Sequence, residues 1–109
     1  MSFQARQGDI FFQSVEAPDL KKLKKKQDNI LAFGEVTGHS HAVKSHKVGE
    51  YESYVDEKGD IYMFSSDKAL EVGHDEHNVI TIPTGQWVCV TRQREYDPLS
   101  ESRQRKVLD

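Results

Sequence analysis

The stretch Glu50-Tyr51-Glu52-Ser53-Tyr54-Val55-Asp56-Glu57-Lys58-Gly59-Asp60-Ile61-Tyr62-Met63-Phe64 predicts the fold class of this chain more directly than any other. Two runs rich in aromatic and β-branched residues flank Asp56-Glu57-Lys58-Gly59, and the glycine supplies the positive φ angle that a tight turn needs. We therefore expect a β-hairpin. Its tyrosines and Phe64 are expected to pack as cross-strand pairs rather than to form a ligand platform.

Shorter runs with strand character fill most of the remaining chain, at residues 9–15, 29–36, 41–44, 68–72, 79–83 and 86–95. Because only the turn Pro83-Thr84-Gly85 separates the last two, we predict that they form a second hairpin. Seven or eight short antiparallel strands with turn signals between them are typical of an all-β barrel or sandwich. Residues 1–96 are predicted to form a single β domain, and the polar residues 97–109 a tail or a short helix.

Composition limits the classes of function. The chain has 109 residues, of which 36% are hydrophobic, and a net charge of −3. A modest core of this size would gain stability from a bound metal or a homo-oligomer interface, and the net charge gives no reason to expect a nucleic acid as partner. The single cysteine, Cys89, favours a buried, inert thiol in a reducing compartment. Since no apolar run approaches the about 20 residues of a membrane span, we predict a soluble cytoplasmic protein.

Two histidine clusters carry the main functional signal, Gly38-His39-Ser40-His41 and Gly73-His74-Asp75-Glu76-His77. Alternate side chains of a strand point to the same face, so the first cluster can present two imidazoles to one point. With the second cluster, the four nitrogens would complete a tetrahedral zinc site, or three would bind and leave a position for water. The alternative is a polar hairpin surface. We interpret His39, His41, His74 and His77 as metal ligands, with zinc preferred and iron as the alternative.

The same site raises the question of catalysis. Glu76 lies between the second pair of histidines, where it could act as general base for a metal-bound water, as in a hydrolase. On the last predicted strand Arg92 and Arg94 share a face and could hold an anionic group of a substrate, although salt bridges to the acidic surface are the simpler interpretation. The sequence leaves open whether the protein is an enzyme.

A lysine-rich segment supports a function of a different class. Leu20 to Gln27 has two leucines spaced for one helical turn and contains Lys21, Lys22, Lys24, Lys25 and Lys26. Together with Arg92 and Arg94 these lysines could form a non-enzymatic binding module for nucleic acid or a protein partner. Because no aromatic residue is interleaved with the lysines for base stacking, we favour a solvated connection instead.

Several short motifs resemble a small group of uncharacterised bacterial and phage proteins: Arg6-Gln7-Gly8-Asp9, residues 34–41, His74-Asp75-Glu76-His77, Pro83-Thr84-Gly85 and residues 92–96. This resemblance implies no activity.

A second likeness, to cupins, rests on the following residues: Gly38, His39, His41, Pro83 and Gly85. The sequence departs from the cupin pattern, because no histidine follows the turn and Lys44 and Ser45 replace the expected acid. The cupin likeness therefore implies a small β-barrel or sandwich with inward histidines, and no cupin chemistry.

Overall fold

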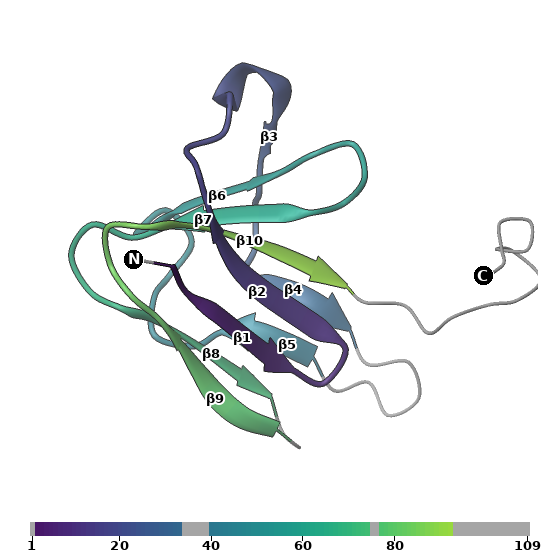
Figure 1. Cartoon of the computed structure of the whole chain (residues 1–109), viewed down its shortest axis with the longest axis vertical. Helices are drawn as coiled ribbons and strands as arrows, with labels where there is room; N and C mark the ends of the chain where they lie inside the picture. Colours follow the sequence, from purple (N-terminus) through teal and green to yellow (C-terminus); the bar gives the residue numbers. More distant parts are fainter. Residues whose placement is uncertain (1, 34–39, 75–76, 93–109) are drawn as a thin grey trace, which may run out of the picture.

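Two β-sheets make up the domain, which we describe from a computed structural model (Figure 1). The structure describes residues 2–33, 40–74 and 77–92. In chain order these residues form β1 (Gln4–Gln7), β2 (Ile10–Val15), a 3-10 helix η1 (Leu20–Lys22), β3 (Lys24–Lys25), β4 (Ile30–Phe33), β5 (Ser40–Val43), β6 (Glu52–Val55), β7 (Ile61–Phe64), β8 (Leu70–His74), β9 (His77–Ile82) and β10 (Trp87–Arg92).

The strands pair antiparallel in both sheets. The large sheet has the order β1-β2-β10-β7-β6-β3 and the small sheet the order β4-β5-β8-β9. The all-β class predicted from the sequence is confirmed, and of the two expected architectures the described residues form a sandwich-like pair of sheets rather than a closed barrel. No helix within the described ranges is long and apolar enough to cross a membrane.

The hairpin predicted at residues 50–64 is confirmed as β6 and β7, with Tyr54 opposite Tyr62. Its turn is held by Asp56, whose Oδ1 accepts hydrogen bonds from the backbone N–H groups of Lys58 (2.9 Å) and Asp60 (3.0 Å). Gly59 has a φ angle of 91°, which a residue with a side chain rarely adopts. Local sequence chemistry is therefore sufficient to form this element.

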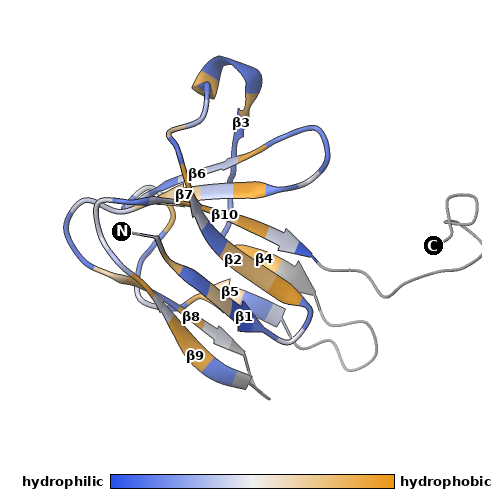
Figure 2. Cartoon of the chain, viewed as in Figure 1, coloured by the Kyte–Doolittle hydropathy of each residue, from blue (hydrophilic) through white to orange (hydrophobic). Residues whose placement is uncertain are grey.

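The hydrophobic core lies between the two sheets. Alternate residues of each strand point inward, as the period of a strand requires, and Figure 2 shows hydrophobic residues on strands of both sheets. The core residues are Ile10, Phe12, Val43, Tyr51, Ile61, Met63, Leu70, Val72, Ile82, Val88 and Val90. Each fully buried large side chain contributes about 1.5–3 kcal/mol relative to an exposed one, so this layer is the main source of stability.

The hairpin predicted for residues 79–95 is wrong. β9 pairs with β8 in the small sheet, whereas β10 pairs with β2 and β7 in the large sheet. The turn at Pro83-Thr84-Gly85 therefore carries the chain from one sheet to the other. Ile82 and Val88 on its two sides are both fully buried, and each faces the core from its own sheet. A turn signal between two alternating runs does not distinguish a hairpin from such a crossing.

The first segments of the chain also differ from expectation. A turn at Arg6–Asp9, with Gly8 at a φ angle of 61°, joins β2 to a strand, β1, that the polar sequence did not indicate. The helical turn predicted in the lysine segment is η1, capped by Asp19, whose side chain accepts a hydrogen bond from the backbone N–H of Lys21. The chain then becomes extended, and β3 pairs with β6.

Candidate functional site: a buried histidine between the sheets

Among the four predicted metal ligands, His41 is the one whose side chain the structure describes. It lies on β5, in the small sheet, and its exposed fraction is 3%. Its Nδ1 atom lies 2.7 Å from Oε1 of Gln7, on β1 of the large sheet. The imidazole therefore bridges the two sheets.

Gln7 determines the proton position on His41. Its Nε2 donates hydrogen bonds to the carbonyl oxygens of Val72 (3.0 Å) and Asn78 (2.6 Å), so both amide hydrogens are used within the small sheet. This fixes the amide orientation and leaves Oε1, which can only accept, facing the imidazole. Nδ1 of His41 must therefore carry a hydrogen, and Nε2 is the ring nitrogen on the side of Asp9.

Asp9 lies beside that second nitrogen. Its Oδ1 is 3.7 Å from Nε2 of His41, and its Oδ2 accepts a 2.7 Å hydrogen bond from Nε of Arg92. Partial burial by itself would raise the pKa of the Asp9 carboxyl, but the hydrogen bond and charge of Arg92, helped by a backbone hydrogen bond and His41, hold that pKa below its ordinary value. Asp9 is thus a carboxylate at neutral pH, with one oxygen directed at His41.

The other predicted ligands are placed only in part. His74 ends β8, and its backbone is paired with that of His77, the first residue of β9. On the neighbouring strand pair Ala42 lies opposite Gly73, and His41 and His74 are the next residues outward. The backbone register therefore brings three of the four predicted ligands to the same end of the small sheet. His39, with Glu76 and Arg94, lies outside the described residues.

Within the described ranges, no group of three or more His, Cys, Asp or Glu side chains is arranged to hold a metal ion. The described part of the site offers two ligand atoms, Nε2 of His41 and Oδ1 of Asp9. Arg92, predicted to hold a substrate anion or to make a surface salt bridge, makes the ion pair with Asp9. A role for Arg92 in substrate binding stays a prediction.

Sequence reasoning missed Gln7 and Asp9. Both belong to the Arg6–Asp9 motif, which carried a family resemblance but no assignment of function. Their partners are far away in the chain, since Gln7 bonds to Val72 and Asn78 and Asp9 bonds to Arg92. The one local signal is the pair of polar residues around Gly8, which a tight turn can direct to one point.

Cys89 is half-buried, less than was expected from its apolar neighbours. Burial, with the nearby charge of Asp60, raises the pKa of its thiol to about 11. The thiol is therefore protonated at neutral pH, in agreement with the prediction of an inert cysteine.

Fold and site together define a small all-β sandwich domain in which a buried histidine, tied to a glutamine and facing a carboxylate, spans the two sheets. The chain belongs to a family of uncharacterised domains, because the family model described as a domain of unknown function (DUF8820) matches residues 6–93. This confirms the predicted likeness to a small uncharacterised family, while a bacterial or phage origin and the cupin likeness stay predictions. No curated protein and no solved structure matches the chain.

Proposed function

We propose that the domain binds a divalent metal ion, zinc in first place and iron as the alternative, at the end of the small sheet. His41 would supply Nε2, Asp9 would supply Oδ1, and one or two of His39, His74 and His77 would complete a set of three or four ligands. The observation that supports this best is the hydrogen bond from Nδ1 of His41 to Gln7. Metal-binding histidines almost always donate their other ring hydrogen to such an acceptor, which fixes the tautomer and the ring orientation.

The electrostatics of the site also favour a bound cation. With Nδ1 protonated, Nε2 of a neutral imidazole carries a lone pair and lies 3.7 Å from the carboxylate of Asp9. Two electron-rich groups facing each other repel, although this repulsion is weakened because 42% of the Asp9 side chain is exposed to solvent. A proton on Nε2 relieves this repulsion, and so does a divalent metal ion between the two atoms.

The distance between the two atoms fits a shared metal ion closely. With metal–nitrogen and metal–oxygen bonds of about 2.1 Å and a tetrahedral angle, the two ligand atoms would lie about 3.4 Å apart. The observed separation of 3.7 Å needs only a small side-chain adjustment to reach this value. Arg92 holds the other oxygen of Asp9, so Oδ1 is already oriented toward His41.

Hydrolysis is the further activity that such a centre would support. A metal ion with three or four protein ligands and one open position lowers the pKa of a bound water to about 7. Glu76 is the residue that we assign as general base, and Arg92 and Arg94 as anchors for an anionic group of the substrate. This catalytic role is a proposal from the sequence and depends on the metal site.

Metal analysis of untagged protein tests the proposal. We expect near-stoichiometric zinc or iron in the purified chain or after reconstitution, and loss of that metal in Asp9→Asn and His41→Ala. His46→Ala is the matched control, because His46 lies outside this site and bonds to Ser45. If His41→Ala fails to fold, the near-isosteric Asp9→Asn still tests the site.

Cobalt provides a second readout that does not depend on affinity for zinc. Tetrahedral Co²⁺ has strong visible absorption, which should appear on titration of the metal-free parent and weaken in Asp9→Asn. A parent protein that takes up neither zinc, iron nor cobalt would overturn the proposal.

A further inference from the structure

The outer face of the large sheet combines aromatic side chains with lysines, and we propose that it binds single-stranded nucleic acid. The contact surface consists of Tyr54, Tyr62, Phe64 and Trp87, with Lys21, Lys22, Lys25 and Lys58 beside them; we call it the aromatic face. It shares no residue with the metal site around His41, so the two proposals stand or fall separately.

The strand register places the first row of this surface. Lys25 lies opposite Tyr54, Tyr54 opposite Tyr62, and Tyr62 opposite Cys89, across β3, β6, β7 and β10. Residues that lie directly opposite each other in antiparallel strands share a face. The residues that alternate with this row, among them Ile61 and Val90, belong to the core. The row therefore faces away from the core, with a lysine at its edge.

Two further rings extend the surface. The ring centroid of Trp87 lies 5.3 Å from that of Phe64 and 6.2 Å from that of Tyr54. All three side chains are half-buried, so part of each ring remains open to solvent. Bases stack on such rings with about 1–3 kcal/mol per base and with little sequence preference.

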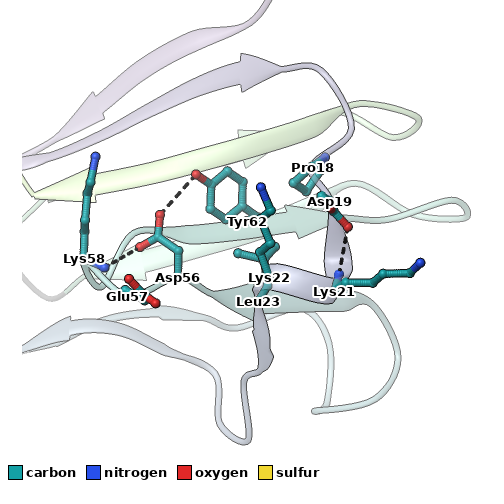
Figure 3. Close-up of a pocket in the computed structure, with 9 residues that line it drawn as sticks. All are labelled: Pro18, Asp19, Lys21, Lys22, Leu23, Asp56, Glu57, Lys58 and Tyr62. Atoms are coloured by element: carbon teal, nitrogen blue, oxygen red, sulfur yellow. Dashed lines mark hydrogen bonds between the residues drawn. The ribbon is translucent and has the colours of Figure 1, made fainter.

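A groove beside Tyr62 brings lysines to this surface. It has a volume of about 580 Å³ and lies between the connection Pro18–Leu23 and the turn Asp56–Lys58. Lys21, Lys22 and Lys58 are among the residues that line it. Figure 3 shows the ring of Tyr62 at its centre, with Lys22 and Leu23 on one side and Asp56 on the other. A base on the ring and phosphates on the lysines would use both kinds of group.

Acidic residues limit the expected affinity, because the groove is lined by as many carboxylates as lysines. Asp19 accepts a hydrogen bond from the backbone N–H of Lys21, and Asp56 accepts from the backbone N–H of Lys58 and from the hydroxyl of Tyr62. Both carboxylates thus serve the local turns, although their charge and that of Glu57 remain. We expect weak binding with a strong salt dependence, and three phosphate contacts predict a slope of about −2 in log affinity against log salt.

Fluorescence provides a site-specific test, because Trp87 is the only tryptophan of the chain. We would titrate the protein with labelled oligo(dT) and oligo(U) at low salt, following the anisotropy of the label and the emission of Trp87. The expected result is quenching of Trp87 together with the rise in anisotropy, and a salt slope of about −2.

Matched lysine variants locate the binding. The triple change Lys21→Gln, Lys22→Gln and Lys58→Gln should weaken oligonucleotide binding about tenfold or more at low salt. The control is Lys44→Gln, Lys47→Gln and Lys68→Gln, which removes the same charge from exposed positions outside the groove and should change the affinity little. Tyr54→Leu should weaken oligonucleotide binding but leave the slope of log affinity against log salt almost unchanged.

Four outcomes would overturn the proposal. They are no rise in anisotropy at low salt, a rise without quenching of Trp87, equal weakening by the two triple variants, and quenching that heparin or an acidic peptide reproduces in full. The last outcome would mean that the face recognises charge alone and that the rings play no part in stacking bases.

Discussion

The interior around His41 and the aromatic face satisfy their polar groups in opposite ways. In the interior Gln7 and His41 are almost fully buried, and the hydrogen bonds of Gln7 join one sheet to the other. On the aromatic face the polar groups bond to near neighbours, as Tyr54 does to Glu52, and the side chains remain partly open to solvent. A buried group depends on one geometry, whereas an exposed group can exchange its partner for water. Substitutions should therefore cost far more in the interior than on the aromatic face.

The largest expected difference is between two adjacent phenylalanines on β2. Phe12 points into the core with an exposed fraction of 0%, while Phe11 lies on the opposite face and is half-buried. Phe12→Ala should lower the free energy of unfolding by about 3–5 kcal/mol, and Phe11→Ala by about 1 kcal/mol. Urea denaturation of the two variants measures both values, and equal losses would contradict the assignment of the faces.

The next effect tests the hydrogen bonds of the interior. Gln7→Leu keeps a side chain of similar size but leaves Nδ1 of His41 and the carbonyl oxygens of Val72 and Asn78 without this partner. We expect a loss of about 2–4 kcal/mol in the free energy of unfolding. Gln4→Leu, on the exposed part of the same strand, is the matched control and should change stability by less than about 0.5 kcal/mol. A stable Gln7→Leu protein would show that water replaces the amide.

A smaller effect is expected at the turn of the β6–β7 hairpin. Gly59 has a φ angle of 91°, and a Cβ atom added there would meet nothing within 4 Å. Gly59→Ala should therefore cost about 1–2 kcal/mol, from backbone strain alone. Gly59→Asn should cost less, since asparagine adopts a positive φ angle more readily. Thermal unfolding of the pair compares them, and equal costs would argue against strain as the cause.

The smallest effect is the pH dependence that the single cysteine, Cys89, gives to the protein. The pKa of Cys89 is raised from 9.0 to about 11, so the folded protein holds this proton more tightly than the unfolded chain does. Its contribution to stability is intact below about pH 9 and is lost as the pH rises toward 11. Thiolate absorbance of this single cysteine should titrate near pH 11 in the folded protein and about two units lower in urea. Coincident curves would contradict the burial of the thiol.

The parts of the structure predicted from the sequence are those that depend on local chemistry. The β6–β7 hairpin follows from its glycine turn and alternating residues, and the helical turn at Leu20–Lys22 follows from the leucine spacing. The predictions failed where contacts between residues far apart in the sequence determine the structure. β1 looks polar because Gln7 faces inward to bond with Val72 and Asn78, and the turn at residues 83–85 carries no mark of the sheet that follows it.

The candidate site divides in the same way. His41 was identified from its cluster, and its orientation depends on Gln7 and Asp9, which no local pattern connects to it. The aromatic face was missed for a related reason. The sequence shows no aromatic residue among the lysines, but pairing of β3 with β6 places Lys25 opposite Tyr54.

The position of β10 within the large sheet has a consequence for the order in which the chain can fold. β10 lies between β2 and β7, and it pairs Val15 with Trp87 and Ile10 with Arg92. During synthesis, β1 and β2 emerge from the ribosome long before the strand that joins them to β7. Contacts between such distant segments are slow to form. Until β10 arrives, the exposed edge of β2 can pair with another chain, so crowded translation is the stage at which this small domain is most open to aggregation.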